Sequence, residues 1–173
     1  RYLHLPALVG SLIVPSPARL VYATAATQVA ALTATQTALL SATQVAALTD
    51  TQVKALTSTQ VAALSVTQVA ALATDQMDAL TATALAGLTA TQVAVLATSQ
   101  LAEITTTALA GLSETAMAAL SATQLTQLST TQVKGLTATE IAALTTTQIA
   151  ALSETQVAVI SATGIAGLTS TQV

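Results

Sequence analysis

The residues of this chain that could do chemistry are few and scattered. His4 is the single histidine, and it lies in a leader unlike the rest of the chain, where an incidental role explains it best. Asp75 and Asp78 are the only neighbouring carboxylates. Their i,i+3 spacing would place both on one helix face, where they could hold a cation, but a solvated face accounts for them better. Ser and Thr are abundant without a base beside them, so they indicate helix caps rather than nucleophiles.

Composition excludes several kinds of site. Catalysis requires groups that converge on one place, and none is visible. There is no cysteine, hence no disulfide framework and no thiolate metal site. The six glycines are isolated from one another, so no phosphate-binding loop is present. Four basic residues cannot form a phosphate-binding stripe, which argues against nucleic acid. We expect no catalytic, cofactor-binding or metal-binding residue, and no enzyme.

The element that must position these residues is an eight-residue repeat. It runs from Thr27 to Thr171 without insertion or deletion, and its unit reads L-[TS]-x-T-Q-V-x-A. A short fixed period predicts one structural unit stacked on itself, that is, a solenoid rather than a globule. Phe and Trp are absent and only 6% of residues are charged, so the core must consist of Leu, Val, Ile and Ala.

The pattern of each unit predicts one short, capped helix. In the unit Leu40 to Leu48, Ser41 stands three residues before Gln44, which is the spacing of a capping box, and Leu40 is placed to pack against Val45 as a hydrophobic staple. The cap is Ser or Thr in every unit from residue 33 onward except at Ala73 and Ala97. We therefore expect a helix of about six or seven residues in each unit, followed by a bend.

The charged residues support this assignment independently. Five of the seven acids fall in the expected first turn, where the helix dipole favours negative charge. These are Asp50, Asp75, Glu114, Glu140 and Glu154. Lys54 and Lys134 come later in their units, and Asp50–Lys54 has the spacing of a favourable i,i+4 pair. A strand has no reason for this ordering.

Two other architectures compete with the capped helix. Thr and Val favour strands, which keeps a narrow β-solenoid open as an alternative; however, Asn is absent and Gly scarce, whereas such solenoids need both at their corners. In one continuous helix, eight residues would advance the apolar pattern by about 80° per unit, so no seam would form. The fold class predicted is therefore an all-α solenoid of very short capped helices, one per repeat.

A longer period is superimposed on the repeat. Three units lose the Gln and gain a Gly before the Leu, at 83–88, 107–112 and 163–168, and the first two are 24 residues apart. Ala73 and Ala97 are also 24 residues apart. This spacing predicts three units per superhelical turn; duplication of a 24-residue segment would leave the same trace.

The chain divides into residues 1–23 and the repeat solenoid, residues 24–173. The first segment has a basic start, an apolar stretch from Leu3 to Val14 and a small residue, Ala23, at its end. That arrangement resembles a secretory signal peptide and implies an extracellular or cell-surface location. An N-terminal cap over the first repeat is an equally good interpretation. The apolar stretch is too short to span a bilayer as a helix.

The regular Gln and Thr positions are the remaining candidates for function. Stacked units would place them in rows, as for Gln44, Gln52, Gln60 and Gln68. We expect these Gln to serve in capping and in hydrogen bonds between units. The alternative is a polar surface for a repetitive ligand, because the Thr-x-Thr spacing resembles the ice-binding face of repetitive antifreeze proteins. That resemblance implies a flat β-solenoid, so the ice-binding interpretation depends on the strand alternative.

Whole units also resemble a known kind of repeat. The LTxxQ[VI]xAL pattern, as in Leu40 to Leu48, is similar to octapeptide tracts of large bacterial surface and adhesin-like proteins. The resemblance covers nearly the whole array and implies a context rather than an activity. Together with the regular period, it predicts a structural protein, a rigid spacer, stalk or filament subunit that associates with itself end to end or side by side. The competing prediction is a ligand-binding array.

Overall fold

The computed structural model describes residues 26–172, and every element in that range is an α-helix of four to six residues. Each octad supplies one helix and one bend, which confirms the all-α solenoid. Within residues 26–172 there is no strand, so the alternative of a narrow β-solenoid is wrong. Six of these helices have the six residues expected from the sequence, and the other twelve have four or five. The leader assigned to residues 1–23 lies outside the described residues.

Helices three places apart in the chain pack against one another along the whole array. They form three columns, each named here by its first member. The α2 column contains α2 (Ala26–Ala30), α5 (Asp50–Lys54), α8 (Thr74–Ala79), α11 (Thr98–Glu103), α14 (Ala122–Thr126) and α17 (Thr146–Ala151). The α3 column contains α3 (Ala34–Ala38), α6 (Ser58–Ala63), α9 (Ala82–Leu85), α12 (Thr106–Leu109), α15 (Thr130–Lys134) and α18 (Glu154–Val159). The α4 column contains α4 (Ala42–Ala46), α7 (Val66–Ala70), α10 (Ala90–Ala94), α13 (Glu114–Ala118), α16 (Ala138–Ala143) and α19 (Ala162–Ile165).

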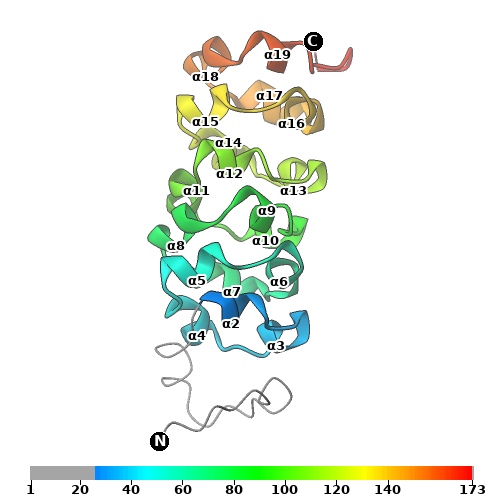
Figure 1. Cartoon of the computed structure of the whole chain (residues 1–173). Helices are drawn as coiled ribbons and strands as arrows, with labels where there is room; N and C mark the ends of the chain where they lie inside the picture. The colour runs from blue at the N-terminus through cyan, green and yellow to red at the C-terminus, as the bar shows by residue number, and fades with distance from the viewer. Residues whose placement is uncertain (1–25, 173) are drawn as a thin grey trace, which may run out of the picture.

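Three octads therefore make one superhelical turn, as the 24-residue spacing predicts. Figure 1 shows the result, a stack of turns rising from α2, α3 and α4 at one end to α19 at the other. The principal helix–helix contacts run between helices three places apart, that is, between neighbouring turns. Stability in such an array comes from repeated local interfaces rather than from one central core.

The bend before every helix from α3 to α19 ends in a cap residue of the same backbone conformation. The cap residue is extended, as at Ser41 with φ −72° and ψ 157°, and the Leu before each cap closes the preceding helix. The Leu48 N–H donates to the Val45 carbonyl at 3.1 Å, a short i→i−3 bond that tightens the last turn. In twelve units the residue before this position also belongs to the bend, which leaves four or five residues for the helix; in the other six units it is the last residue of a six-residue helix.

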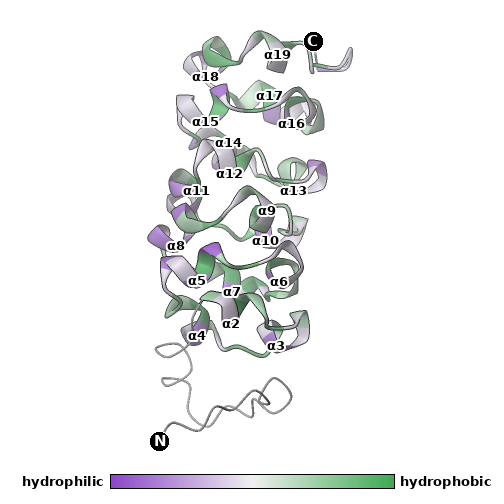
Figure 2. Cartoon of the chain, viewed as in Figure 1, coloured by the Kyte–Doolittle hydropathy of each residue, from purple (hydrophilic) through white to green (hydrophobic). Residues whose placement is uncertain are grey.

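In most units one apolar side chain from the helix and the Leu or Ile of the bend fill the interior. Val45, Val53, Leu101 and Met117, one from each of four helices, have no exposed surface. Leu40, which precedes the cap of α4, packs against the same core as Val45, as the staple pattern predicts. Figure 2 shows apolar residues throughout the stack and hydrophilic residues concentrated on particular helices, including α8 and α11. Each buried Leu or Val contributes about 1.5–3 kcal/mol.

Candidate functional site

The Gln at the third helical position is the most heavily bonded side chain of the repeat. In α4 the Gln44 N–H donates to the Ser41 hydroxyl at 3.1 Å, and the Gln44 Oε1 accepts from the Ser41 N–H at 2.7 Å. This reciprocal capping box recurs in α3, α5, α6, α7, α10, α14, α15, α17 and α18. It satisfies two backbone donors that the helix start would otherwise leave open.

The same side chain also joins successive turns of the superhelix. Gln92 Nε2 donates to the carbonyl of Leu64 at 2.6 Å and to that of Val61 at 2.9 Å. These acceptors lie 28 and 31 residues earlier, in the bend after α6 and in α6 itself. Bonds to the residue 28 places earlier recur for Gln60, Gln68, Gln76, Gln100, Gln124, Gln132, Gln148, Gln156 and Gln172.

The Gln rows therefore serve in capping and inter-unit bonding, as predicted. The bridging Gln92 is only 2% exposed, and its amide oxygen and nitrogen are both bonded. An external ligand would have to displace these bonds, which are buried and costly to leave unmade. The Gln positions hold the solenoid together.

Hydroxyl groups form the rows that remain on the surface. The Thr two residues after each cap is exposed wherever it occurs in residues 26–172. In the α3 column the row is Thr35, Thr59, Thr83, Thr107, Thr131 and Thr155. In the α4 column it is Thr43, Thr67, Thr91, Thr115, Thr139 and Thr163. The α2 column is interrupted by Asp75 and Ser99, so only two of the three rows are unbroken.

These hydroxyls do not lie on a flat sheet. The cap hydroxyl of a Thr-x-Thr pair accepts from the Gln N–H, as Thr89 does from Gln92 at 3.3 Å, and some pairs also bond each other, as Thr89 and Thr91 do at 3.0 Å. The premise of the ice-binding interpretation, a β-solenoid with both hydroxyls on one plane, is wrong. The rows consist of first-turn residues of separate helices.

Charge is unevenly distributed over the three columns. The α2 column carries five exposed charged residues on α5, α8 and α11: Asp50, Lys54, Asp75, Asp78 and Glu103. The α3 column has none from α3 to α12, and the α4 column none from α4 to α10. All five acids expected in a first turn are found there, and Lys54 and Lys134 are in last turns, which agrees with the helix dipole.

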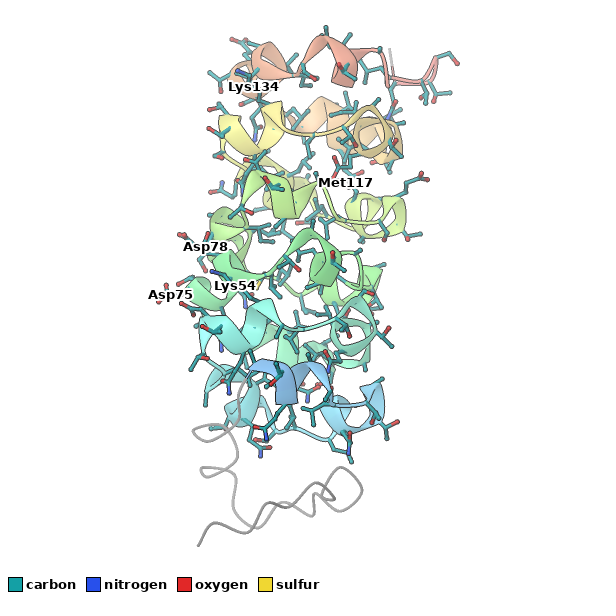
Figure 3. The ribbon with its side chains drawn as sticks, in the orientation of Figure 1. Lys54, Asp75, Asp78, Met117 and Lys134 are labelled. Atoms are coloured by element: carbon teal, nitrogen blue, oxygen red, sulfur yellow. The ribbon has the colours of Figure 1, made fainter. Side chains whose placement is uncertain are left out.

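The neighbouring carboxylates Asp75 and Asp78 lie on α8, and both are exposed. Figure 3 shows them at the outer edge of the stack, whereas Met117 lies inside it. Among the described residues there is no group of three or more side chains that could hold a metal ion. Asp50 and Lys54 are both exposed and form no ion pair with each other in the described structure, so the expected i,i+4 pair is not made. His4 lies outside the described residues.

Glu140 departs from this pattern of exposed charge. It occupies the Gln position of α16 and is only 3% exposed. Its Oε2 accepts from the Thr137 N–H at 2.7 Å and from the Thr137 hydroxyl at 2.9 Å, while its Oε1 is buried without a partner. Burial raises the pKa of this carboxyl, and the bonds from Thr137 lower it by less. Sequence reasoning counted Glu140 only as a first-turn acid; its place in the Gln row is the signal that could have distinguished it.

Comparison with known proteins supplies no relative. No family model, no curated protein and no solved structure matches the chain. Of the helices in residues 26–172, none combines the length and the apolar character needed to cross a membrane. Function must therefore be argued from the geometry of the repeat.

Proposed function

We propose that the chain is a structural protein, a rigid spacer or stalk whose role is to set a distance. The supporting observation is the bridging Gln, which joins each turn to the one before it throughout most of the array. Because these polar groups are used within the solenoid, they make the rod stiff and are not available for ligand chemistry. An extracellular or cell-surface setting is part of the proposal, and it rests on the signal-like leader and on the resemblance to bacterial surface repeats.

Small-angle X-ray scattering on lengthened chains tests the spacer role. A variant with residues 89–112 duplicated in tandem gains one 24-residue turn in register. We expect its maximum dimension to increase while its cross-section stays constant. The control is an insertion of equal length rich in Gly and Ser, which should add a flexible segment and broaden the distribution of dimensions. A compact particle whose cross-section grows with the added turn would contradict the spacer role.

Self-association is the second part of the proposal. The uncharged stretches of the α3 and α4 columns present Thr, Ser and Ala without charges to repel a second copy. A filament would form if these faces pair side by side. Static light scattering over a dilution series measures this directly. A monomer at every concentration would exclude the filament and leave the spacer role unaffected.

The competing proposal is a surface for a repetitive ligand. It is supported by the two unbroken Thr rows, which repeat at every turn and face outward. Because the flat sheet that ice binding requires is absent from residues 26–172, the ligand proposed is a repetitive polymer, and co-sedimentation with an insoluble polysaccharide tests it. Substitution of Thr59, Thr83 and Thr107 by Val would interrupt the hydroxyl row of the α3 column and should abolish any binding found. The same substitutions leave the buried Gln bridges intact, so the rod should persist.

A further inference from the structure

The carboxyl of Glu140 stands where the repeat requires a hydrogen-bond donor. At the same position of the preceding octad, Gln132 Nε2 donates to the carbonyls of Leu101 at 2.8 Å and Ile104 at 2.7 Å. The corresponding carbonyls for position 140, counted by the same 31 and 28 residues, belong to Leu109 and Leu112. Both are acceptors only. The oxygen that replaces the amide nitrogen at this position is the buried, unpartnered Oε1.

The hydrogen bonds of Glu140 show which oxygen would carry a proton. Oε2 accepts from two Thr137 donors, so it acts as the equivalent of the Gln carbonyl oxygen. Oε1 then corresponds to Nε2, and only a protonated Oε1 can donate toward the Leu109 and Leu112 carbonyls. An ionised Oε1 would instead place negative charge beside carbonyl oxygens in a buried site, which is strongly unfavourable.

Among residues 26–172, no opposite charge is placed to stabilise an ionised Glu140, and α12, which supplies the Leu109 carbonyl, carries no charge. Helix α16 packs against α13 and α19. Glu114 is the one charged residue on α13 and is exposed, and α19 carries none. Lys134, on the preceding α15, is exposed and makes no ion pair with Glu140 in the described structure, and the following α17 carries no charge. Desolvation is therefore the largest influence on the pKa of Glu140, and it raises that pKa.

We propose that Glu140 is a protonation-dependent joint between two turns of the solenoid. When protonated, its Oε1–H donates to the bend between α12 and α13, as the Gln amide does elsewhere. When the proton leaves, this bond is lost and a buried charge remains, so α16 separates more readily from α13. The solenoid thus contains one pH-sensitive turn in an otherwise pH-insensitive row of Gln bridges.

The sign of the pH dependence follows from the direction of the pKa shift. Since the native state holds the proton more tightly than the unfolded chain does, the stabilising contribution of Glu140 is complete below the ordinary Glu pKa. It is lost as the pH rises through the raised pKa of the folded state. The contact between the two turns is therefore strongest in acid and weakens as the pH rises through the raised pKa of the folded Glu140 carboxyl.

Comparison of the unsubstituted chain with Glu140→Gln tests the proposal. Urea unfolding between about pH 4 and about pH 8 should give similar folding constants in acid. Above the ordinary Glu pKa, the ratio in favour of Glu140→Gln should rise by up to about tenfold per pH unit until the folded carboxyl ionises. The matched control is Glu154→Gln, which removes an exposed carboxylate from α18. This variant should keep the pH dependence of the unsubstituted chain.

Two further measurements make the test independent of global unfolding. The carboxyl ¹³C resonance of Glu140, identified by its absence in Glu140→Gln, should titrate above the ordinary Glu range in the folded chain. Gln132→Glu, which puts a carboxyl on the carbonyls of Leu101 and Ile104, should acquire a second pH-dependent loss of stability. Together they distinguish a property of this position from a general effect of acid.

Three results would overturn the proposal that Glu140 is a protonation-dependent joint. Parallel pH profiles for the unsubstituted chain and Glu140→Gln would show that position 140 does not sense pH. A Glu140 resonance that titrates in the ordinary range would show that the carboxyl is ionised while buried. Stabilisation of the unsubstituted chain, but not of Glu140→Gln, by Na⁺, K⁺ or Ca²⁺ would show that a cation rather than a proton occupies the position.

Discussion

Two kinds of unit join successive turns of the solenoid by different contacts. Units such as α10 use the Gln amide, whose Nε2 reaches the carbonyls of the turn before. Units α9, α12 and α19 have Ala or Gly at that position and a Gly before the Leu. An added Cβ at Gly87 would lie 2.0 Å from the Ser58 carbonyl oxygen, and at Gly111 2.3 Å from that of Ala82. Here the backbones of two turns touch directly.

In α9 and α12, close backbone approach takes the place of the bridging amide; α13 has neither the Gln nor the Gly. Loss of the Gln is accompanied by a larger buried residue at the next position, Leu85 in α9 and Leu109 in α12, where most Gln units have Val. The larger side chain fills space beside the missing amide, and the Gly lets the turns come together. The same 24-residue turn therefore forms with either set of local contacts.

Gly87→Ala is expected to have the largest effect on this comparison. The new methyl group would overlap the carbonyl and Cα of Ser58, which are backbone atoms and cannot rotate away. We expect the free energy of unfolding to fall by about 3 kcal/mol, at the upper end of overpacking effects. Denaturant unfolding monitored by circular dichroism measures the change.

Gly135→Ala is the matched control, because it makes the same substitution at the same octad position. There the nearest atom is the Cγ2 of the Thr106 side chain, which can adopt another rotamer. The expected loss is about 1 kcal/mol or less. Equal losses at the two glycines would show that direct backbone contact is not what distinguishes α9.

Gln92→Ala tests the other kind of interface. It removes one acceptor for the Thr89 N–H and two bonds to the turn before, leaving buried backbone groups without partners. We expect a loss of about 2–3 kcal/mol, measured by the same unfolding assay. Hydrogen exchange should rise at the Thr89 amide.

Gln36→Ala is the control for Gln92→Ala. Gln36 makes the capping box with Thr33 but no described bond to another turn, so its removal should cost about 1 kcal/mol. Equal losses of unfolding free energy at positions 36 and 92 would show that the bridges contribute little. Capping alone would then explain why Gln recurs in the repeat.

Conversion of one interface into the other gives a smaller, non-additive effect. The variant Ala84→Gln/Leu85→Val/Gly87→Ala rebuilds α9 as a Gln unit. Because the new amide can bond the turn before and the smaller Val leaves it room, we expect this variant to recover about 1–2 kcal/mol relative to Gly87→Ala alone. A triple variant less stable than Gly87→Ala would show that the two interfaces are not interchangeable in this position.

Much of this architecture could be predicted from the sequence because the controlling interactions are local. The capping box, the first-turn acids and the three-unit turn all follow from spacings within 24 residues. The inter-turn bonds of the Gln rows were expected, but not their acceptors. Those acceptors depend on how far one turn rises above the last, a distance set by packing and absent from any spacing in the chain.

The errors have similar physical causes. Most helices have four or five residues rather than six or seven, because the Leu before each cap, such as Leu48, bonds to the carbonyl three residues back and belongs, with the residue before it, to the bend. The Gly in 83–88 indicated the 24-residue period. Its close contact with Ser58 of the preceding turn was not predicted. A first-turn acid such as Glu140 is ordinarily solvated, and its burial follows instead from its place in the Gln row, whose other Gln members from Gln44 to Gln156 are also buried.

The smallest expected effect concerns the cap, which both kinds of unit share. Ala97 is extended at φ −68° and ψ 151° without a side-chain cap bond, yet Gln100 Oε1 still accepts from its N–H at 2.9 Å. Half of the capping box is therefore already in place, and the backbone needs no rearrangement to accept a hydroxyl. Ala97→Ser should raise the free energy of unfolding by about 1 kcal/mol, whereas Ala97→Val, with no oxygen to accept the Gln100 N–H, should not. No gain from Ser would mean that the Gln alone satisfies the helix start, so that the inter-turn contacts, rather than the caps, set the stability of the rod.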